Sequence, residues 1–150
     1  MNTKNFWIAA TAGGALSLLV TNLPYVGFVN CLLCVGFWGS AIFAVWLYHR
    51  LNGTITVREA VKVGAVSGLI AGVIGFLLSF LGLAGVQGMM KGLEGVIPAK
   101  DLQGMQEIPA WAGWLINVLG VVFEFGCGAL GGWIGGAIFR TDREAGKAGK

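Results

Sequence analysis

The sequence contains very few charged side chains. Only 10 lysine and arginine residues and 7 aspartate and glutamate residues occur among 150 residues, which is 11% of the chain. A soluble globular domain carries about one quarter. The chain therefore lacks the charge that a water-facing surface needs, and it has no basic patch of the kind that nucleic acids bind. It also lacks any recognised catalytic or cofactor-binding signature, so we expect neither an enzyme nor a resident cofactor.

Hydrophobic residues make up 56% of the chain, and they are gathered into long blocks rather than scattered. A helix that crosses a bilayer needs about 20 predominantly apolar residues. The pattern predicts an all-α, polytopic membrane protein with lipid as its main partner and one transmembrane domain over residues 1–150. Its expected parts are four spans at about 6–21, 26–48, 57–83 and 111–139, an outer loop at 84–110 and a tail at 140–150.

Local signals separate these spans. No small-x-small cleavage pattern follows Val20, so we expect the first span to be an uncleaved anchor. Pro24 and Gly27 then favour a tight turn. Thr56 and Glu59 have the spacing of a capping box, in which each side chain bonds the backbone amide of the other residue. This pattern predicts that the third helix begins at Val57.

The basic residues predict the orientation of the spans, since cytoplasmic loops carry the excess of lysine and arginine. Only Lys91 and Lys100 fall in the predicted outer loop. The pattern places both termini and the link between the second and third spans on the cytoplasmic side. The basic residues expected there are Lys4, Arg50, Arg58, Lys62, Arg140, Arg143, Lys147 and Lys150.

Small residues recur at helical spacing in every predicted span. Helices in lipid attract each other mainly through close packing over such residues, so we expect a bundle packed on small residues. The same stripes would serve packing within a monomer or assembly into a homo-oligomer or a larger membrane complex. The main stripes are Gly64, Gly68, Gly72, Gly75 and Ser79 in the third span and Gly128, Gly132 and Gly136, with Gly131 and Gly135, in the fourth. The others are Ala9, Gly13 and Ser17 in the first span and Gly36, Ser40 and Ala44 in the second.

Two segments of the sequence match each other. Residues 39–43 read Gly-Ser-Ala-Ile-Phe and residues 135–139 read Gly-Gly-Ala-Ile-Phe. In the same register Cys31 meets Cys127 and Gly36 meets Gly132. A true repeat would make the protein two parallel helical hairpins related by an axis along the membrane normal; chance matches between glycine-rich helices are the alternative.

Glu124 is the one ionisable residue placed well inside a predicted span. A charge at that depth costs about 2.5–3.5 kcal/mol on insertion scales, so the carboxyl group is expected to be protonated or turned toward polar groups. Asn117 lies on the same helical face, and Ser40 and Ser67 lie at comparable depth. One interpretation is a site that binds a proton or a cation in a transport path. The other is a neutral carboxyl group that bridges two helices.

Cys31 and Cys34 open the second predicted span and face the same way on a helix. Such a pair suits a disulfide, thiol exchange or half of a metal site. Without further cysteine or histidine nearby, the pair is too small for a closed zinc site. The alternative is that both thiols pack as small apolar side chains.

Parts of the second and third predicted spans resemble a group of known proteins. Pro24, the Asn30-Cys31-x-x-Cys34 element, Gly36, Gly39 and the following Thr54-Ile55-Thr56-Val57 resemble a loose group of small bacterial four-helix membrane proteins. The resemblance covers roughly residues 20–80. It implies a bacterial cytoplasmic (inner) membrane, and it implies no activity.

Three functions from different classes fit these observations. The first is a structural or accessory subunit that packs against itself or a larger membrane complex, and we expect this one. The second is a channel or transporter coupled to a proton or cation at Glu124. The third is a thiol redox protein that uses Cys31 and Cys34.

Overall fold

The described part of the chain is made of four α-helices. The computed structural model describes residues 2–22, 35–81 and 109–139. The helices are α1 (Thr3–Asn22), α3 (Val35–Asn52), α4 (Val57–Phe80) and α7 (Ala110–Phe139). The predicted all-α class is therefore confirmed. The segments that hold Cys31, Cys34, the outer loop at 84–110 and the tail at 140–150 lie outside the described residues.

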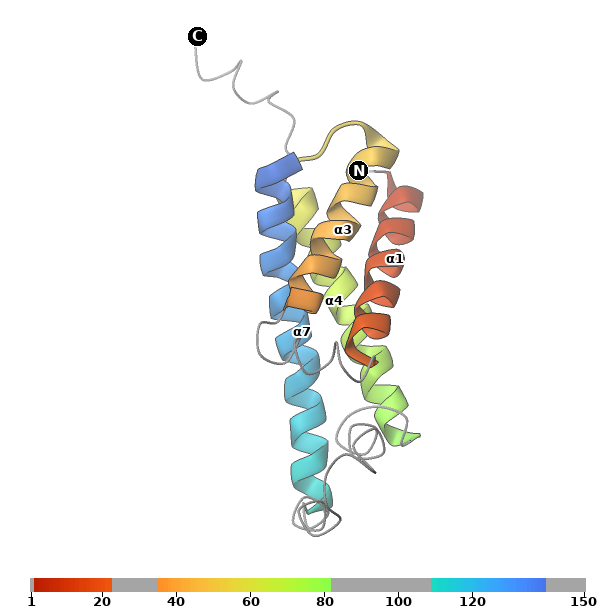
Figure 1. Cartoon of the computed structure of the whole chain (residues 1–150), viewed down its shortest axis with the longest axis vertical. Coiled ribbons are helices and arrows are strands. Elements are labelled where there is room, and N and C mark those ends of the chain that lie inside the picture. Colours follow the sequence, from red (N-terminus) through yellow and green to blue (C-terminus); the bar gives the residue numbers. More distant parts are fainter. Residues whose placement is uncertain (1, 23–34, 82–108, 140–150) are drawn as a thin grey trace.

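The helices stand side by side and alternate in direction along the chain (Figure 1). The start of α1, the end of α3, the start of α4 and the end of α7 consequently lie together at one end of the bundle. We call this the basic end, and the opposite end the far end. The basic end carries the exposed side chains of Lys4, Arg50, Arg58 and Lys62.

Contacts between helices run around a four-membered ring. Helix α1 contacts α3 and α4, and α7 contacts α3 and α4, while α3 also touches α4 across the centre. Helices α1 and α7 therefore occupy opposite corners of the ring (Figure 1). In this arrangement α4 and α7 are antiparallel neighbours, whereas α3 and α7 are parallel neighbours.

The observed boundaries extend two of the predicted spans. Helix α1 begins at Thr3 instead of residue 6, and α3 continues to Asn52 instead of ending at residue 48. These added turns hold Lys4, His49 and Arg50, polar residues that hydropathy alone places outside an apolar span. Helical hydrogen bonding tolerates such residues where the chain leaves the bundle.

Two helices are long and apolar enough to cross a membrane: α4 over Val57–Phe80 and α7 over Trp111–Phe139. Their 24 and 29 residues correspond to helices of about 36 and 44 Å, against a hydrocarbon thickness of about 30 Å. Figure 1 shows α4 and α7 extending past the described parts of α1 and α3 at the far end.

The link between α3 and α4 has well-defined caps at both sides. Gly53 adopts a positive φ of 75°, and its amide donates to the His49 carbonyl at 2.8 Å, which ends α3. The predicted capping box is confirmed: Glu59 N donates to Thr56 Oγ1 at 3.3 Å, and Thr56 N donates to Glu59 Oε2 at 3.2 Å. Helix α4 begins at Val57 as the sequence predicts.

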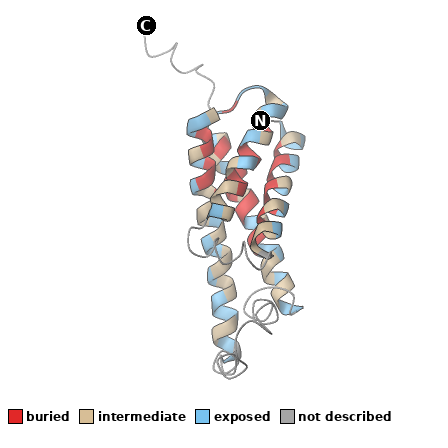
Figure 2. Cartoon of the chain, viewed as in Figure 1, coloured by how far each residue is buried: buried red, intermediate tan, exposed pale blue. Residues whose placement is uncertain are grey.

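Buried residues gather toward the basic end (Figure 2). Most of them are small, and Tyr48, only 1% exposed, is the largest fully buried side chain. The ring of Tyr48 meets Phe6 edge-on at 6.4 Å. The core cluster at this end consists of Phe6, Ala9, Ala44, Val45, Tyr48, Ile55, Ala60 and Val63.

Candidate functional site

The closest contact in the bundle lies between α4 and α7. It is built by the six glycines whose packing role the sequence predicts, and we call it the glycine contact. Successive pairs advance by about one helical turn along each helix in opposite directions, as antiparallel packing requires. Its members are Gly64, Gly68 and Gly72 on α4 and Gly128, Gly132 and Gly136 on α7.

Backbone atoms meet directly in this contact. A methyl group on Gly64 would overlap the Gly128 carbonyl oxygen, and one on Gly128 would overlap the Gly64 carbonyl oxygen. A methyl group on Gly132 would lie 2.6 Å from the Ala60 oxygen, and one on Gly72 would lie 3.0 Å from the Val121 Cα. The two helices therefore approach as closely as polypeptide backbones allow, which is the packing that small residues permit in lipid.

The predicted stripe on α4 does not continue past Gly72 as a contact with α7. A methyl group on Gly75 would meet only the Leu18 side chain of α1, at 3.9 Å. Ser79 donates to the carbonyl of Phe76 on its own helix at 2.9 Å. The stripe thus serves two neighbours, since α4 also lies beside α1.

Two other glycines of α7 face α3 instead. A methyl group on Gly131 would lie 2.5 Å from the Trp38 carbonyl oxygen and 2.8 Å from Ala41 Cβ. One on Gly135 would lie 3.0 Å from Val45 Cβ. Adjacent glycine pairs at 131–132 and 135–136 therefore let α7 pack against two helices at once.

The backbone of Glu124 takes part in the glycine contact. The Glu124 backbone carbonyl is the atom that a methyl group on Gly68 would overlap. The side-chain oxygen Oε2 is buried and has no hydrogen-bond partner within residues 2–22, 35–81 and 109–139. The preceding residue, Phe123, meets Phe37 of α3 edge-on at 6.0 Å.

The polar residues predicted to surround Glu124 make other contacts. Asn117 Nδ2 donates to the Gly113 carbonyl of its own helix at 3.0 Å, and Ser40 Oγ donates to the Phe37 carbonyl at 2.8 Å. Ser67 is buried against α1, where a methyl group on Gly13 would lie 2.5 Å from its Oγ. Ser67 therefore turns away from α7, because α1 and α7 lie at opposite corners of the ring.

Cys127 is the described cysteine, and it lies half-buried on α7, three residues after Glu124. Cys31 and Cys34 belong to the undescribed segment 23–34. Among the described ranges, no group of three or more histidine, cysteine, aspartate or glutamate residues is placed to hold a metal ion.

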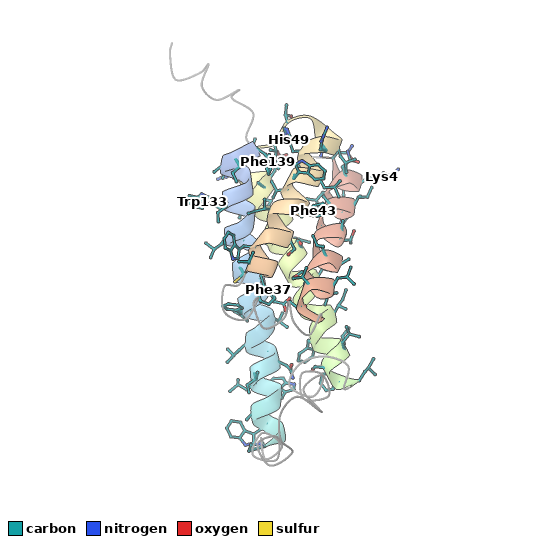
Figure 3. The ribbon with its side chains drawn as sticks, viewed as in Figure 1. Lys4, Phe37, Phe43, His49, Trp133 and Phe139 are labelled. Carbon is teal, nitrogen blue, oxygen red and sulfur yellow. The ribbon has the colours of Figure 1, made fainter. Side chains whose placement is uncertain are left out.

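Sequence reasoning missed a polar cluster at the basic end. Asn5 Nδ2 donates to Asn52 Oδ1 at 3.0 Å and to the Leu51 carbonyl at 3.3 Å, which ties the start of α1 to the end of α3. His49 stacks on Phe139 at 6.1 Å, and the two rings lie together in Figure 3. The available signal was an asparagine at the terminus of two consecutive spans, a position where side-chain amides cap exposed backbone groups.

Comparisons with known proteins do not extend this description. No protein family, no curated protein and no solved structure matches the chain. The fold and the site consequently rest on the residues and contacts given above.

Proposed function

We propose that this chain is a four-span integral membrane protein that acts as a structural or accessory subunit of a membrane assembly. The observation that carries the proposal is the distribution of side chains by size. Glycine, alanine and serine fill the contacts between helices, while large apolar side chains point outward. In water such a surface would far exceed the few hundred Å² of contiguous apolar area that a soluble monomer tolerates.

Outward-facing apolar side chains occur on all four helices. Helix α1 exposes Trp7 and Leu19, α3 exposes Phe43, α4 exposes Leu77, and α7 exposes Trp133. Figure 3 shows Trp133 pointing away from the bundle. This distribution supports membrane insertion of α1 and α3 together with α4 and α7, because a lipid environment is the solvent that all four outer faces suit.

The ends of the bundle support one orientation. The alternating helices bring the exposed residues Lys4, Arg50, Arg58 and Lys62 to one end. Arg50 also lies over the Trp46 ring at 5.6 Å, a pairing suited to the membrane interface. We infer that this basic end faces the cytoplasm of a bacterial cell, since cytoplasmic loops carry most of the lysine and arginine.

The assembly role is supported by two glycines that do not pack against any other helix of the described chain. A methyl group on Gly39 or Gly126 would meet no described atom within 4 Å. Gly39 lies between exposed Val35 and Phe43, one turn away on each side, and Gly126 lies likewise between exposed Val122 and Leu130. Each forms a notch between large side chains, into which the backbone of another helix can fit.

Membrane insertion and topology are tested first. We expect the full chain to remain in alkali-washed membranes and to require detergent for extraction. We also expect reporters fused to either terminus to be active only in the cytoplasm. Recovery of the chain in buffer without detergent would contradict membrane insertion, and a reporter exposed outside the cell would contradict the orientation.

The assembly role is tested with bulky residues in the notches. Gly39→Leu and Gly126→Leu should convert cross-linked multimers of the chain in native membranes to monomers without lowering the unfolding temperature of the detergent-solubilised chain. Ala15→Leu is the matched control, because Ala15 is exposed on the outer face of α1. The proposed role would be contradicted by notch variants that assemble normally, or by a wild-type chain that cross-links neither to a second copy nor to another membrane protein.

A further inference from the structure

Glu124 is placed where a transmembrane carboxyl group is hardest to hydrate. It is residue 15 of the 30 residues of α7, counting from Ala110. Its backbone carbonyl packs against Gly68, and its Oε2 atom is buried and finds no hydrogen-bond donor in the described ranges. An ionised carboxylate needs such donors or a cation when it leaves water.

No positive charge of the described chain is near enough to compensate it. Lys4, His49, Arg50 and Arg58 lie at the basic end. Lys62 is the closest along α4, but it is six residues before Gly68, about 9 Å along the helix axis, and its side chain is exposed. The other described acid, Glu59, is engaged in the capping box of α4.

The bundle is closed between Glu124 and the basic end. Gly128 and Gly64 meet through their backbones, Gly132 meets Ala60, and Gly131 meets Trp38 of α3. Gly128, Gly131 and Gly132 all follow Glu124 on α7, so these contacts lie on the side of the basic end. The buried side chains of the core cluster fill the same level, which leaves water no path between the helices.

On the other side of Glu124 the close contact between α4 and α7 continues for one further turn, since a methyl group on Gly72 would lie 3.0 Å from the Val121 Cα. Toward the far end, the same face of α7 carries Gly113, Asn117 and Gly120, at offsets of eleven, seven and four residues. A methyl group on Gly113 or Gly120 would meet no described atom within 4 Å. Among the described residues, this face thus carries small and polar side chains between the far end and Glu124, whereas buried residues gather toward the basic end (Figure 2).

We propose that Glu124 is a proton-binding site whose carboxyl group exchanges its proton with the far side of the membrane and not with the cytoplasmic side. The bound ligand is a proton, since within the described ranges no group of three or more histidine, cysteine, aspartate or glutamate residues is placed to hold a metal ion. The site adds a chemical function to the structural role proposed above. It rests on the four-span placement but not on the assembly of several copies.

The test uses dicyclohexylcarbodiimide and the full chain in sealed vesicles of known orientation. This apolar reagent reacts with a carboxyl group that carries its proton. The acid O–H adds across one C=N bond, and the product rearranges to a stable N-acylurea, so the labelled peptide gains the whole reagent and nothing leaves. Mass spectrometry of peptides locates the adduct.

We expect one major adduct, on Glu124, with complete loss in Glu124→Gln and retention in Glu59→Gln. Raising the pH on the far side alone should slow labelling, by up to about tenfold per pH unit once the group titrates. Raising the pH on the cytoplasmic side alone should leave the rate unchanged. If Glu124→Gln does not fold, fragmentation of the wild-type peptide still locates the adduct.

Two results would overturn the proposal. Absence of a Glu124 adduct at every pH would mean that the carboxyl group does not bind a proton in the bundle. A labelling rate that follows the cytoplasmic pH would mean that the glycine contacts do not close that side. Neither result bears on membrane insertion, which the extraction and topology experiments test separately.

Discussion

Helix α7 is held by two neighbours in different ways. Against α4, glycine lies on glycine, so that carbonyl oxygens of one helix occupy the space of missing side chains on the other. Against α3, only Gly131 lies on backbone, while Gly135 faces the Val45 side chain. Two ring pairs complete this contact: Phe123 of α7 meets an aromatic ring of α3, and His49 of α3 meets one of α7. The first contact depends on the absence of side chains, whereas the second depends on their presence.

This difference determines how each contact responds to mutation. A backbone cannot move aside without shifting a whole helix, so a single added carbon in the glycine contact forces the helices apart. A phenylalanine side chain can change its rotamer or be replaced by one of similar size. At Gly135 an added methyl group would meet Val45 Cβ at 3.0 Å, which is a milder overlap than the backbone overlaps at Gly64 and Gly128. We therefore expect α4–α7 packing to be the more brittle of the two.

The largest effect is expected for Gly128→Ala. The new methyl group would overlap the Gly64 carbonyl oxygen, and overpacking of this kind costs about 3 kcal/mol. The measurement is the free energy of unfolding in mixed micelles, followed by circular dichroism. Gly126→Ala is the matched control two residues away, with no described atom within 4 Å. Both variants are compared in an excess of micelles that keeps the chain monomeric, so that the proposed notch at Gly126 is empty.

The control should move in the opposite direction. Replacing a helical glycine by alanine stabilises the helix by about 0.5–1 kcal/mol when the site has room. Equal effects of Gly126→Ala and Gly128→Ala would show that helix propensity, not contact with α4, governs both positions.

A smaller difference in unfolding free energy is expected between two α7 glycines that lie within one turn, one facing α4 and the other facing α3. Gly132→Ala places a methyl group 2.6 Å from the Ala60 carbonyl oxygen, whereas Gly135→Ala places one 3.0 Å from the Val45 side chain. We expect a cost of about 2 kcal/mol for the first and less than about 1 kcal/mol for the second. The same unfolding measurement applies, and a larger cost for Gly135→Ala would reverse the comparison.

The sequence predicts which residues pack but not which helix each one meets. Four-residue spacing identifies Gly128, Gly132 and Gly136 as one face, and the structure places that face on α4. Gly131 and Gly135 are only one position away, yet they meet α3. Helical periodicity defines the direction of a residue around its own axis, and it contains no information about which neighbour lies in that direction.

The same limit explains the polar residues around Glu124. Depth along a span is predictable from residue count, and on that basis Ser67 and Glu124 are at similar levels. Rotation around the helix then separates them, because Gly68 faces Glu124 while Ser67 faces Gly13 of α1. The capping box was predictable in full, since both of its partners lie within four residues of sequence.

An intermediate effect tests whether the α4–α7 contact depends on the start of α4. Thr56→Ala removes the hydroxyl that accepts from Glu59 N and should cost about 1 kcal/mol. Gly136 packs on Val57 and Ala60 in the first turn of α4. The backbone amides of that first turn should therefore exchange hydrogen faster, while the amides near Gly72 are unaffected. Thr56→Ser retains the hydroxyl and serves as the control. Uniformly faster exchange along α4 would mean that the cap supports the whole helix.

The smallest expected effect concerns the ring contact between α3 and α7. Phe37 and Phe123 meet edge-on at 6.0 Å, with an interplanar angle of 90°. Such pairs contribute about 0.5–1.5 kcal/mol beyond the area that they bury, and the exposure of Phe123 favours the lower part of that range. A double-mutant cycle with Phe37→Leu and Phe123→Leu isolates this term from the loss of apolar area, because the area terms cancel in the cycle. A coupling energy near zero would mean that Gly131 alone holds α3 against α7 at this level, and the two contacts of α7 would then share one mechanism.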